Sequence, residues 1–254
     1  LTEDIMVSKE AKDGVLFVSV CDGGKEYLFD IKHKEAEHLS VNVYKVGTEP
    51  VILIESDSDL MFYNHKGDLL NSYDVKDVDW GVSKYVAGST LYFKSETIKM
   101  EMGFNLLTGE KMWEHEYFYC PDFIVGPNNM LYALKVQNSE TLMRNVDFCL
   151  VKLDPLTGEY TKTVFATKID FGLDNVRYSI AGNRLYYSVT NGGDIYYGVL
   201  DLDSLLVIEE NVVMMANRKP AKQNRCYSVT APIAVGDKVY VHVYFDMLNV
   251  FSIQ

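Results

Sequence analysis

The chain has 254 residues, 48% of them hydrophobic and 24% charged, which is enough apolar material for a core and excludes a disordered chain. Its formal net charge of −12 repels a phosphate backbone, so no nucleic-acid partner is expected. No apolar run approaches the roughly 18 residues of a membrane-spanning helix, so no membrane partner is expected either. The 18 Tyr and 12 Phe favour β-strands, on which aromatic side chains pack well.

A glycine-containing turn followed by an apolar and aromatic strand recurs along the whole chain. The turn glycines are Gly14, Gly47, Gly88, Gly126, Gly182 and Gly236. The strand that follows each turn, such as "LFVSV" or "LYFK", leads through a polar loop to a second strand, such as "EYLFDI" or "MEMGFNL". The six units average about 42 residues each, which is the length of one four-stranded propeller blade.

This period predicts an all-β fold. We expect one domain over residues 1–254, built as a six-bladed β-propeller of four-stranded antiparallel blades. The N-terminal segment "LTEDIMVS" is expected to pair with the last blade, because an open ring would leave a long exposed strand edge. The loops that join successive blades are expected to share one rim with the loops between the second and third strands of each unit.

Two units share the phrase Asn/Asp-x-Leu-Thr-Gly-Glu. The phrase begins at Asn105 in "NLLTGEKMWE" and at Asp154 in "DPLTGEYTKTVF". Gly109 and Gly158 can take the positive φ of a tight turn, and the Asn or Asp side chain can cap that turn. We therefore predict a hairpin between the two outer strands of a blade, with an architectural role.

These phrases, together with "NNMLYALK", resemble the repeats of the quinoprotein-like (pyrroloquinoline-quinone-repeat) β-propeller superfamily. The resemblance implies the propeller fold and not a particular activity, because that superfamily contains both quinone dehydrogenases and cofactor-free assembly scaffolds. Its dehydrogenases place two adjacent cysteines beside the quinone. The cysteines of this chain are far apart, at Cys21, Cys120, Cys149 and Cys226. We expect a cofactor-free binding protein of this type.

No catalytic or metal-binding motif stands out. The five histidines form neither an H-x-H nor an H-E-x-x-H pattern, and a nucleophile elbow and a P-loop are both missing. We expect a protein that is not an enzyme and that holds no metal or other cofactor. Two alternatives stay open: a metal-dependent lactonase or hydrolase with its site at the central channel, and a periplasmic assembly scaffold. The separated cysteines favour buried free thiols and hence the cytoplasm, with a periplasmic or secreted location left open.

Carboxylates and aromatic side chains are concentrated in the loops that are expected on one rim. An acidic surface with aromatic anchors favours rapid capture of a basic protein partner. One version of this hypothesis is an immunity protein that neutralises a cationic toxin, such as a nuclease. The predicted partner-binding residues are Asp22, Asp57, Asp59, Asp77, Asp79, Trp80, Tyr117, Tyr119, Asp122, Asp170, Asp174 and Asp194.

Overall fold

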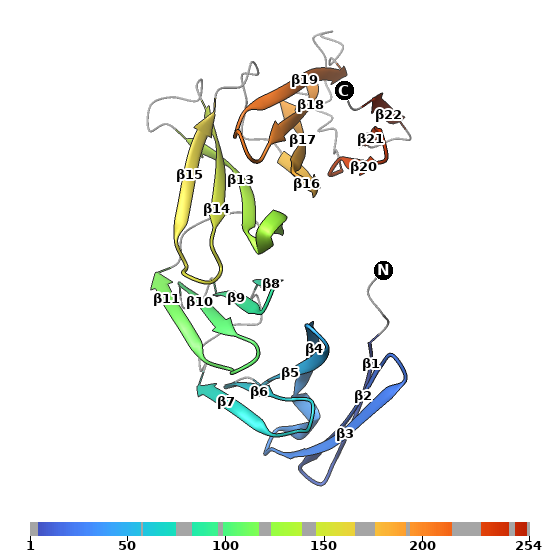
Figure 1. Cartoon of the computed structure of the whole chain (residues 1–254), viewed down its shortest axis with the longest axis vertical. Helices are drawn as coiled ribbons and strands as arrows, with labels where there is room; N and C mark the ends of the chain where they lie inside the picture. Colours follow the sequence, from blue (N-terminus) through green and yellow to red (C-terminus); the bar gives the residue numbers. More distant parts are fainter. Residues whose placement is uncertain are drawn as a thin grey trace, which may run out of the picture. The chain divides into compact units, whose positions relative to one another are not determined.

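The computed structural model describes residues 5–56, 58–74, 83–95, 99–116, 123–138, 146–165, 176–191, 194–214, 230–243 and 247–252. In this part of the chain the strands form six antiparallel sheets of three or four strands, and the helical residues are limited to two short 3-10 turns (Figure 1). Strands that follow one another in the chain lie side by side in each sheet. The predicted all-β class is confirmed.

The first three sheets contain the strands up to Glu116. The first sheet consists of β1 (Met6–Lys12), β2 (Val15–Asp22) and β3 (Lys25–Lys32), and the 3-10 turn η1 (Ala36–His38) follows it. The second sheet consists of β4 (Ser40–Val46), β5 (Glu49–Glu55), β6 (Asp59–Tyr63) and β7 (Leu69–Asp74). The third sheet consists of β8 (Ser83–Ala87), β9 (Thr90–Ser95), β10 (Met100–Asn105) and β11 (Lys111–Glu116).

The remaining strands form three further sheets. The fourth sheet consists of β12 (Ile124–Val125), β13 (Leu131–Asn138), β14 (Val146–Leu153) and β15 (Tyr160–Phe165), with the 3-10 turn η2 (Pro127–Asn129) after β12. The fifth sheet consists of β16 (Val176–Ala181), β17 (Arg184–Asn191), β18 (Asp194–Asp201) and β19 (Val207–Met214). The sixth sheet consists of β20 (Ile233–Val235), β21 (Lys238–Val243) and β22 (Met247–Ser252). Within the described residues the four middle sheets thus have the four strands of a blade, and the first and sixth have three.

The chain divides into two compact units. The first comprises Leu1–Tyr119 and Pro155–Gly158, and the second comprises Cys120–Asp154 and Glu159–Gln254. The first three sheets belong to the first unit and the other three to the second. The single domain and the six-bladed ring expected from the sequence stay predictions.

The six predicted glycine turns all join the first strand of a sheet to its second strand. Five of these glycines have positive φ values, between 57° and 76°. At the sixth turn, between β12 and β13, Asn128 and Asn129 take the left-handed conformation instead (φ 57° and 58°). The phase of the repeat that the sequence predicts is therefore confirmed.

The first of these turns fixes the place of the N-terminal strand. Asp13 and Gly14 both have positive φ (53° and 76°), which is the conformation of a two-residue turn that matches the twist of a hairpin. The turn sets Lys12 opposite Val15, and β1 then pairs with β2 along its whole length. The expectation that this segment belongs to the last blade is wrong for the described residues from Met6 onward, because the tight turn commits them to the first sheet.

The predicted hairpins between outer strands are also present. In the third sheet Asn105 N donates to Glu110 O (2.8 Å), and Asn105 Oδ1 accepts a hydrogen bond from Leu107 N (2.9 Å). Gly109 has a φ of 70° at the position where the chain reverses. In the fifth sheet Leu205, with a φ of 58°, occupies the corresponding left-handed position. The Thr-Gly-Glu phrase is confirmed as a turn motif.

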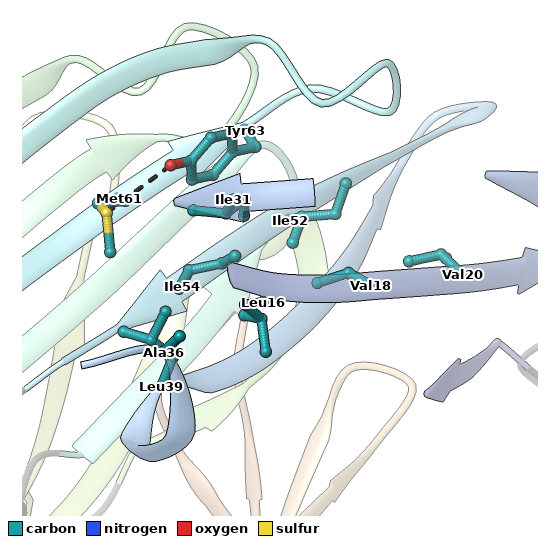
Figure 2. Packing of buried hydrophobic residues seen from close by; sticks show 10 residues of the cluster. All are labelled: Leu16, Val18, Val20, Ile31, Ala36, Leu39, Ile52, Ile54, Met61 and Tyr63. Atoms are coloured by element: carbon teal, nitrogen blue, oxygen red, sulfur yellow. Dashed lines mark hydrogen bonds between the residues drawn. The ribbon is translucent and has the colours of Figure 1, made fainter. Parts of the chain in front are cut away.

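Neighbouring sheets of the first unit pack face to face. Strand β5 is buried on both faces, because Ile52 and Ile54 point to the first sheet while Val51 and Leu53 point to the third. A strand that is covered on both sides has no need of alternating polar residues, which explains the unbroken run "VILI". Figure 2 shows the core between the first and second sheets, which consists of Leu16, Val18, Val20, Ile31, Ala36, Leu39, Ile52, Ile54, Met61 and Tyr63.

The second unit is built in the same way. Strand β17 directs Leu185 and Val189 into a core shared with the fourth sheet, and it directs Tyr186 into a core shared with the sixth. In the latter core the ring of Tyr197 stacks on Phe251 with ring centroids 4.6 Å apart. Alternate residues of one strand therefore serve two different cores.

Two strand glycines make room for aromatic rings. Gly103 in β10 is paired with Trp113 in β11, and a Cβ atom at Gly103 would overlap the indole. The indole Nε1 donates to Pro155 O (2.8 Å). Pro155 lies in the turn between β14 and β15, and this turn, Pro155–Gly158, is part of the first unit. Gly198 in β18 receives the ring of Tyr187 in the same manner. Each glycine is therefore a packing requirement of its sheet.

The first sheet packs on the second with its ends reversed. We call the end of a sheet that carries its glycine turn the glycine-turn end, and the other the remote end. His33 N donates to Gly14 O at the glycine-turn end of the first sheet (3.1 Å), and His33 Nε2 lies 3.5 Å from Asp59 Oδ2 at the remote end of the second. On the other side, Lys45 near the glycine turn of the second sheet forms an ion pair with Asp22 at the remote end of the first (Nζ to Oδ1, 3.0 Å).

The odd number of strands in the first sheet explains this reversal. After three strands the chain leaves at the glycine-turn end, whereas after four it would leave at the remote end. Strand β4 must begin at the remote end of the second sheet, where Ser40 pairs with Glu55. The link of residues 33–39 contains η1 and is too compact to return along an eight-residue strand, which is roughly 25 Å long. The second and third sheets, which are joined after four strands, have matching ends, and an ion pair between Glu55 and Lys84 connects their remote ends.

Candidate functional site

Most of the predicted partner-binding residues lie outside the described part of the chain. These are Asp57, Asp77, Asp79, Trp80, Tyr117, Tyr119, Asp122, Asp170 and Asp174. Of the other three, Asp194 begins β18 opposite Asn191, Asp22 ends β2 and Asp59 begins β6. The structure describes the side chains of Asp22 and Asp59. Asp22 forms an ion pair and Asp59 accepts hydrogen bonds, both within the first unit.

Asp59 belongs to a hydrogen-bond network at the connection between β5 and β6. Its Oδ2 accepts hydrogen bonds from Ser58 Oγ (2.6 Å) and Ser56 Oγ (3.2 Å), and it lies 3.5 Å from His33 Nε2. The Asp59 amide donates to Ser56 Oγ (2.9 Å). The hydrogen bond from Ser58 is the main reason that the pKa of Asp59 lies below its usual value of 3.8; partial burial opposes this shift, and Ser56 and His33 add to it. The carboxylate is therefore held in its charged form.

We expect Asp59→Asn to lower the free energy of unfolding by about 1 kcal/mol near neutral pH, because a charged acceptor of two hydroxyl groups is lost. The pKa of Asp59 is lower in the folded protein than in the unfolded chain. Its stabilising effect is therefore present above pH 3.8 and is lost as the pH falls through the folded value. Urea unfolding near pH 7 and near pH 3 should show a cost that shrinks at the lower pH. A cost that is equal at both pH values, or one shared by the exposed control Asp237→Asn, would contradict this reading.

Asp22 is a buried member of an ion pair. Its side chain is 7% exposed, and its Oδ1 lies 3.0 Å from Nζ of Lys45, whose side chain is 32% exposed. A carboxylate that is paired and desolvated within its own chain presents little charge to a partner. The structure therefore assigns Asp22 to the packing of the first sheet on the second.

The prediction that Asp22 and Asp59 share one rim is wrong. Asp22 contacts Lys45 at the glycine-turn end of the second sheet, while Asp59 lies at the remote end of the same sheet. The length of β5, roughly 20 Å, separates these two ends. The reversed packing of the first sheet is the reason, because it moves the β2–β3 turn to the other end of its neighbour.

A buried ion pair connects the second sheet to the third. Glu55 Oε2 accepts a hydrogen bond from Lys84 Nζ, and the two side chains are 7% and 23% exposed. Glu55 Oε1 is buried and has no hydrogen-bond partner among the described residues. Burial, with a contribution from the charge of Glu55, raises the pKa of Tyr44 to about 12. This pair stabilises the contact between the second and third sheets, and its carboxylate is buried while its ammonium group is partly exposed.

Other groups with chemical potential are dispersed. Among the described residues no cluster of three or more His, Cys, Asp or Glu side chains could hold a metal ion. Cys149 is a buried cysteine outside any disulfide, as the sequence predicts, and Cys21 is a half-buried one. In the same residues no helix is both long and apolar enough to cross a membrane.

The sequence prediction overlooked the outer face of the first sheet. Glu10, Phe17 and Asp30 lie side by side there, on β1, β2 and β3. The signal was present in the segment "VLFVSV", whose alternation assigns Leu16 and Val18 to one face and Phe17 to the other.

The comparisons with known proteins identify no family. No protein-family model matches the sequence, and no curated protein matches it either. Solved structures are similar to the chain only at low identity. Hydrazine synthase of Kuenenia stuttgartiensis is 14% identical with a TM-score of 0.43, over 75% of this chain and 51% of that one. An uncharacterized protein of Listeria monocytogenes EGD-e is 12% identical with a TM-score of 0.46, over 83% and 63%.

Hsv2 of Kluyvelomyces marxianus is 11% identical with a TM-score of 0.48, over 94% of this chain and 69% of that one. The chain thus spans about half to about two thirds of the length of these structures. All three TM-scores are below 0.5, so these similarities assign the chain neither a fold family nor a function.

Proposed function

We propose that the six sheets are the blades of a β-propeller that binds a basic protein partner through acidic connections and has no enzymatic activity. In one version the protein is an immunity protein that neutralises a cationic toxin, such as a nuclease. The glycine turns that recur in phase and the four-stranded second to fifth sheets support blade-like units. The first sheet departs from a regular blade, because it has three described strands and packs with its ends reversed.

The observation that carries the binding proposal is the direction of the strands that flank three acidic connections. Segments 75–82, 117–122 and 166–175 contain most of the predicted binding residues, and each connects one sheet to the next. The strand before each segment runs away from the glycine-turn end, and the strand after it runs toward that end. The strands that flank each connection therefore end and begin at the remote end of their own sheets, which a common rim would require.

Charge supports the same reading. The net charge of −12 creates a negative potential that attracts cationic proteins and accelerates their encounter. Carboxylates near aromatic residues, such as Asp77 and Asp79 beside Trp80, supply both steering and an anchor. Binding of this kind weakens as salt screens the charges.

We expect Asp77→Lys combined with Asp79→Lys to weaken the binding of a basic nuclease domain about tenfold without destabilising the protein, because both substitutions place cations in the proposed contact surface. The control is Glu110→Lys combined with Asp237→Lys, which makes the same charge change at exposed positions at glycine-turn ends. Affinity should be measured at about 0.05 M and about 0.3 M salt. Equal losses in both double variants would assign the effect to net charge, and a wild type that does not bind at low salt would refute the proposal.

A further inference from the structure

The three strands of the first sheet correspond to the second, third and fourth strands of a four-stranded sheet. In the third sheet the turn between the third and fourth strands packs on β7, the fourth strand of the second sheet. A Cβ atom at Gly109 would overlap Asn71 there, and Tyr73 Oη donates to Gly109 O (2.8 Å). The equivalent turn of the second sheet packs on β3, because a Cβ atom at Gly67 would overlap Phe29. The third strand of the first sheet therefore occupies the place of a fourth strand.

Strand direction supports the same correspondence. β7 runs from the glycine-turn end of the second sheet to its remote end. β3 starts beside Asp22, whose partner Lys45 is near that glycine turn, and it leads to His33, which lies close to Asp59 at the remote end. The two strands thus run the same way. Among the described residues it is the first strand of this sheet, and not the fourth, that has no counterpart.

The place of that first strand is the free edge of β1, which pairs with β2 alone in the described chain. Lys12 and Val15 flank a two-residue turn, so they exchange both of their backbone hydrogen bonds, and every second residue of β1 does the same. The N–H and C=O groups of Val7, Lys9 and Ala11 point away from β2, and no described residue pairs with them. Such a row of donors and acceptors is a template for another strand.

The space beside this edge borders a strand that is covered on one face only. β4 is the first strand of the second sheet, and its Tyr44 and Val46 pack in one core with Val86 of β8, the first strand of the third sheet. On the other face Val41 and Val43 are half-buried beside the core between the first and second sheets, and no first strand lies opposite them in the described chain. Apolar side chains of an added strand would extend that core.

Face-to-face packing of sheets does not pair an edge of this kind. In a propeller each sheet covers the face of its neighbour, while the edges of the innermost strands border the central channel. Hydrogen bonds to the free edge of β1 therefore require a further extended segment.

Two sources of such a segment are disfavoured. In the other five sheets a Gly or Asn in the left-handed conformation leads from the first strand to the second, whereas the segment before β1, "LTEDI", contains neither residue type. A second copy could pair β1 with itself, but a twofold axis through the middle of the strand would place Lys9 opposite Lys9. Like charges directly opposite each other destabilise a sheet.

The same lysine favours an acidic residue from another protein. Lys9 Nζ donates to Leu39 O (2.5 Å) and forms no ion pair within the described residues. A carboxylate on the position of an added strand directly opposite Lys9 would form a cross-strand pair of opposite charges. The neighbouring positions on that face lie opposite Val7 and Ala11, which suit apolar side chains.

We propose that the free edge of β1 binds an extended segment of a protein partner as an added antiparallel strand, with an acidic residue opposite Lys9 and apolar residues two positions before and after it. This inference goes beyond the proposed function, because it depends on the strands of the first unit alone and not on the acidic connections.

The test uses the full chain and the fluorescent peptide Lys-Thr-Val-Thr-Glu-Thr-Val-Thr-Lys. As a strand this peptide directs the side chains of Val and Glu to one face and their N–H groups to one edge. Wild type should bind it, and should bind a version with Lys in place of Glu about threefold more weakly. N-methylation of both Val and of Glu removes the donors that face β1 and should weaken binding at least about tenfold. N-methylation of the last three Thr, on the opposite edge, should weaken it less than about threefold.

A matched pair of variants tests the same edge from the side of the protein. Lys9→Pro removes an N–H that points away from β2, which an edge strand tolerates, and it should weaken peptide binding at least about tenfold. The control Lys9→Ala keeps that N–H and should weaken binding only about threefold, through the lost charge. Urea unfolding shows whether both variants are folded, and the two methylated peptides test the edge independently of either variant.

Three results would overturn the inference. The first is equal affinity for the two methylated peptides, or equal losses in Lys9→Pro and Lys9→Ala. The second is a wild type that does not bind the unmethylated peptide, because another segment of the chain would then cover the edge. The third is a dimer in sedimentation that Lys9→Pro converts to a monomer, because a second copy would then pair with β1.

Discussion

Gly103→Ala is expected to lower the free energy of unfolding by about 3 kcal/mol, because its methyl group would occupy the position of the Trp113 indole. The indole cannot move without weakening the hydrogen bond from Nε1 to Pro155 O (2.8 Å). The expected loss of unfolding free energy is therefore the sum of two costs, the overpacking and the weakened hydrogen bond. The measurement is urea unfolding followed by circular dichroism, with tryptophan emission recorded in a Trp80→Phe background so that Trp113 alone reports.

Gly182→Ala provides the control for the backbone alone. Gly182 has a φ of 57°, and nothing lies within 4 Å of the position that its Cβ would take. Alanine there should cost only the strain of a left-handed conformation, about 1 kcal/mol. Gly103 has no positive φ, so the difference between the two variants isolates the clash with the indole. Equal urea midpoints for the two variants would show that Trp113 does not sit against Gly103.

Lys84→Met should cost about 3 kcal/mol, because it leaves the buried carboxylate of Glu55 without its cation. This value is at the low end for a buried pair, since the Lys84 side chain is 23% exposed and water can partly replace it. Glu55 Oε1 already has no hydrogen-bond partner in the described chain, so the carboxylate has few other means of compensation. Urea unfolding of the single variants gives the cost directly.

The double variant Glu55→Leu with Lys84→Met should recover most of that loss, because an apolar pair of similar size needs no counter-ion. Lys111→Met is the control for an exposed pair: Lys111 and Glu114 are 37% and 38% exposed, and the substitution should cost no more than about 0.5 kcal/mol. If Lys84→Met costs as little as Lys111→Met, the pair between the second and third sheets does not stabilise the protein.

The features that the sequence predicted well are those decided by neighbouring residues. A turn such as the one at Gly14 or Gly109 depends on a few backbone angles and on a side chain like Asn105 that can cap it, and these can be read from a short segment. The strand that follows the turn at Gly47 was predicted in the same way, and the structure shows that its run "VILI" is buried. Strand order followed, because every sheet is a meander of consecutive strands.

The features that the sequence did not predict depend on residues far apart in the chain. The sequence predicted that Asp22 is a loop carboxylate on a binding surface, whereas in the structure it forms a buried ion pair with Lys45. The sequence predicted Asp59 on the same rim as Asp22, but the reversed packing of the first sheet places the two residues at opposite ends of the second sheet. The ion pair between Glu55 and Lys84 joins residues that no local pattern connects. The choice among side-chain partners is made by the packing of whole sheets, which a single sequence does not display.

The odd number of strands in the first sheet sets its orientation on the second sheet. An odd or an even number of strands decides whether the chain leaves a sheet at its glycine-turn end or at its remote end. It therefore also decides whether the ends of that sheet match or oppose the ends of the next one. An insertion of one more strand between Lys32 and Ser40, on the order of six residues, would make the count even and invert the mounting. The β2–β3 turn would then lie beside Asp59 and the glycine turn of the first sheet beside Lys45. Such a chain can acquire a new set of surface loops through a change in length alone.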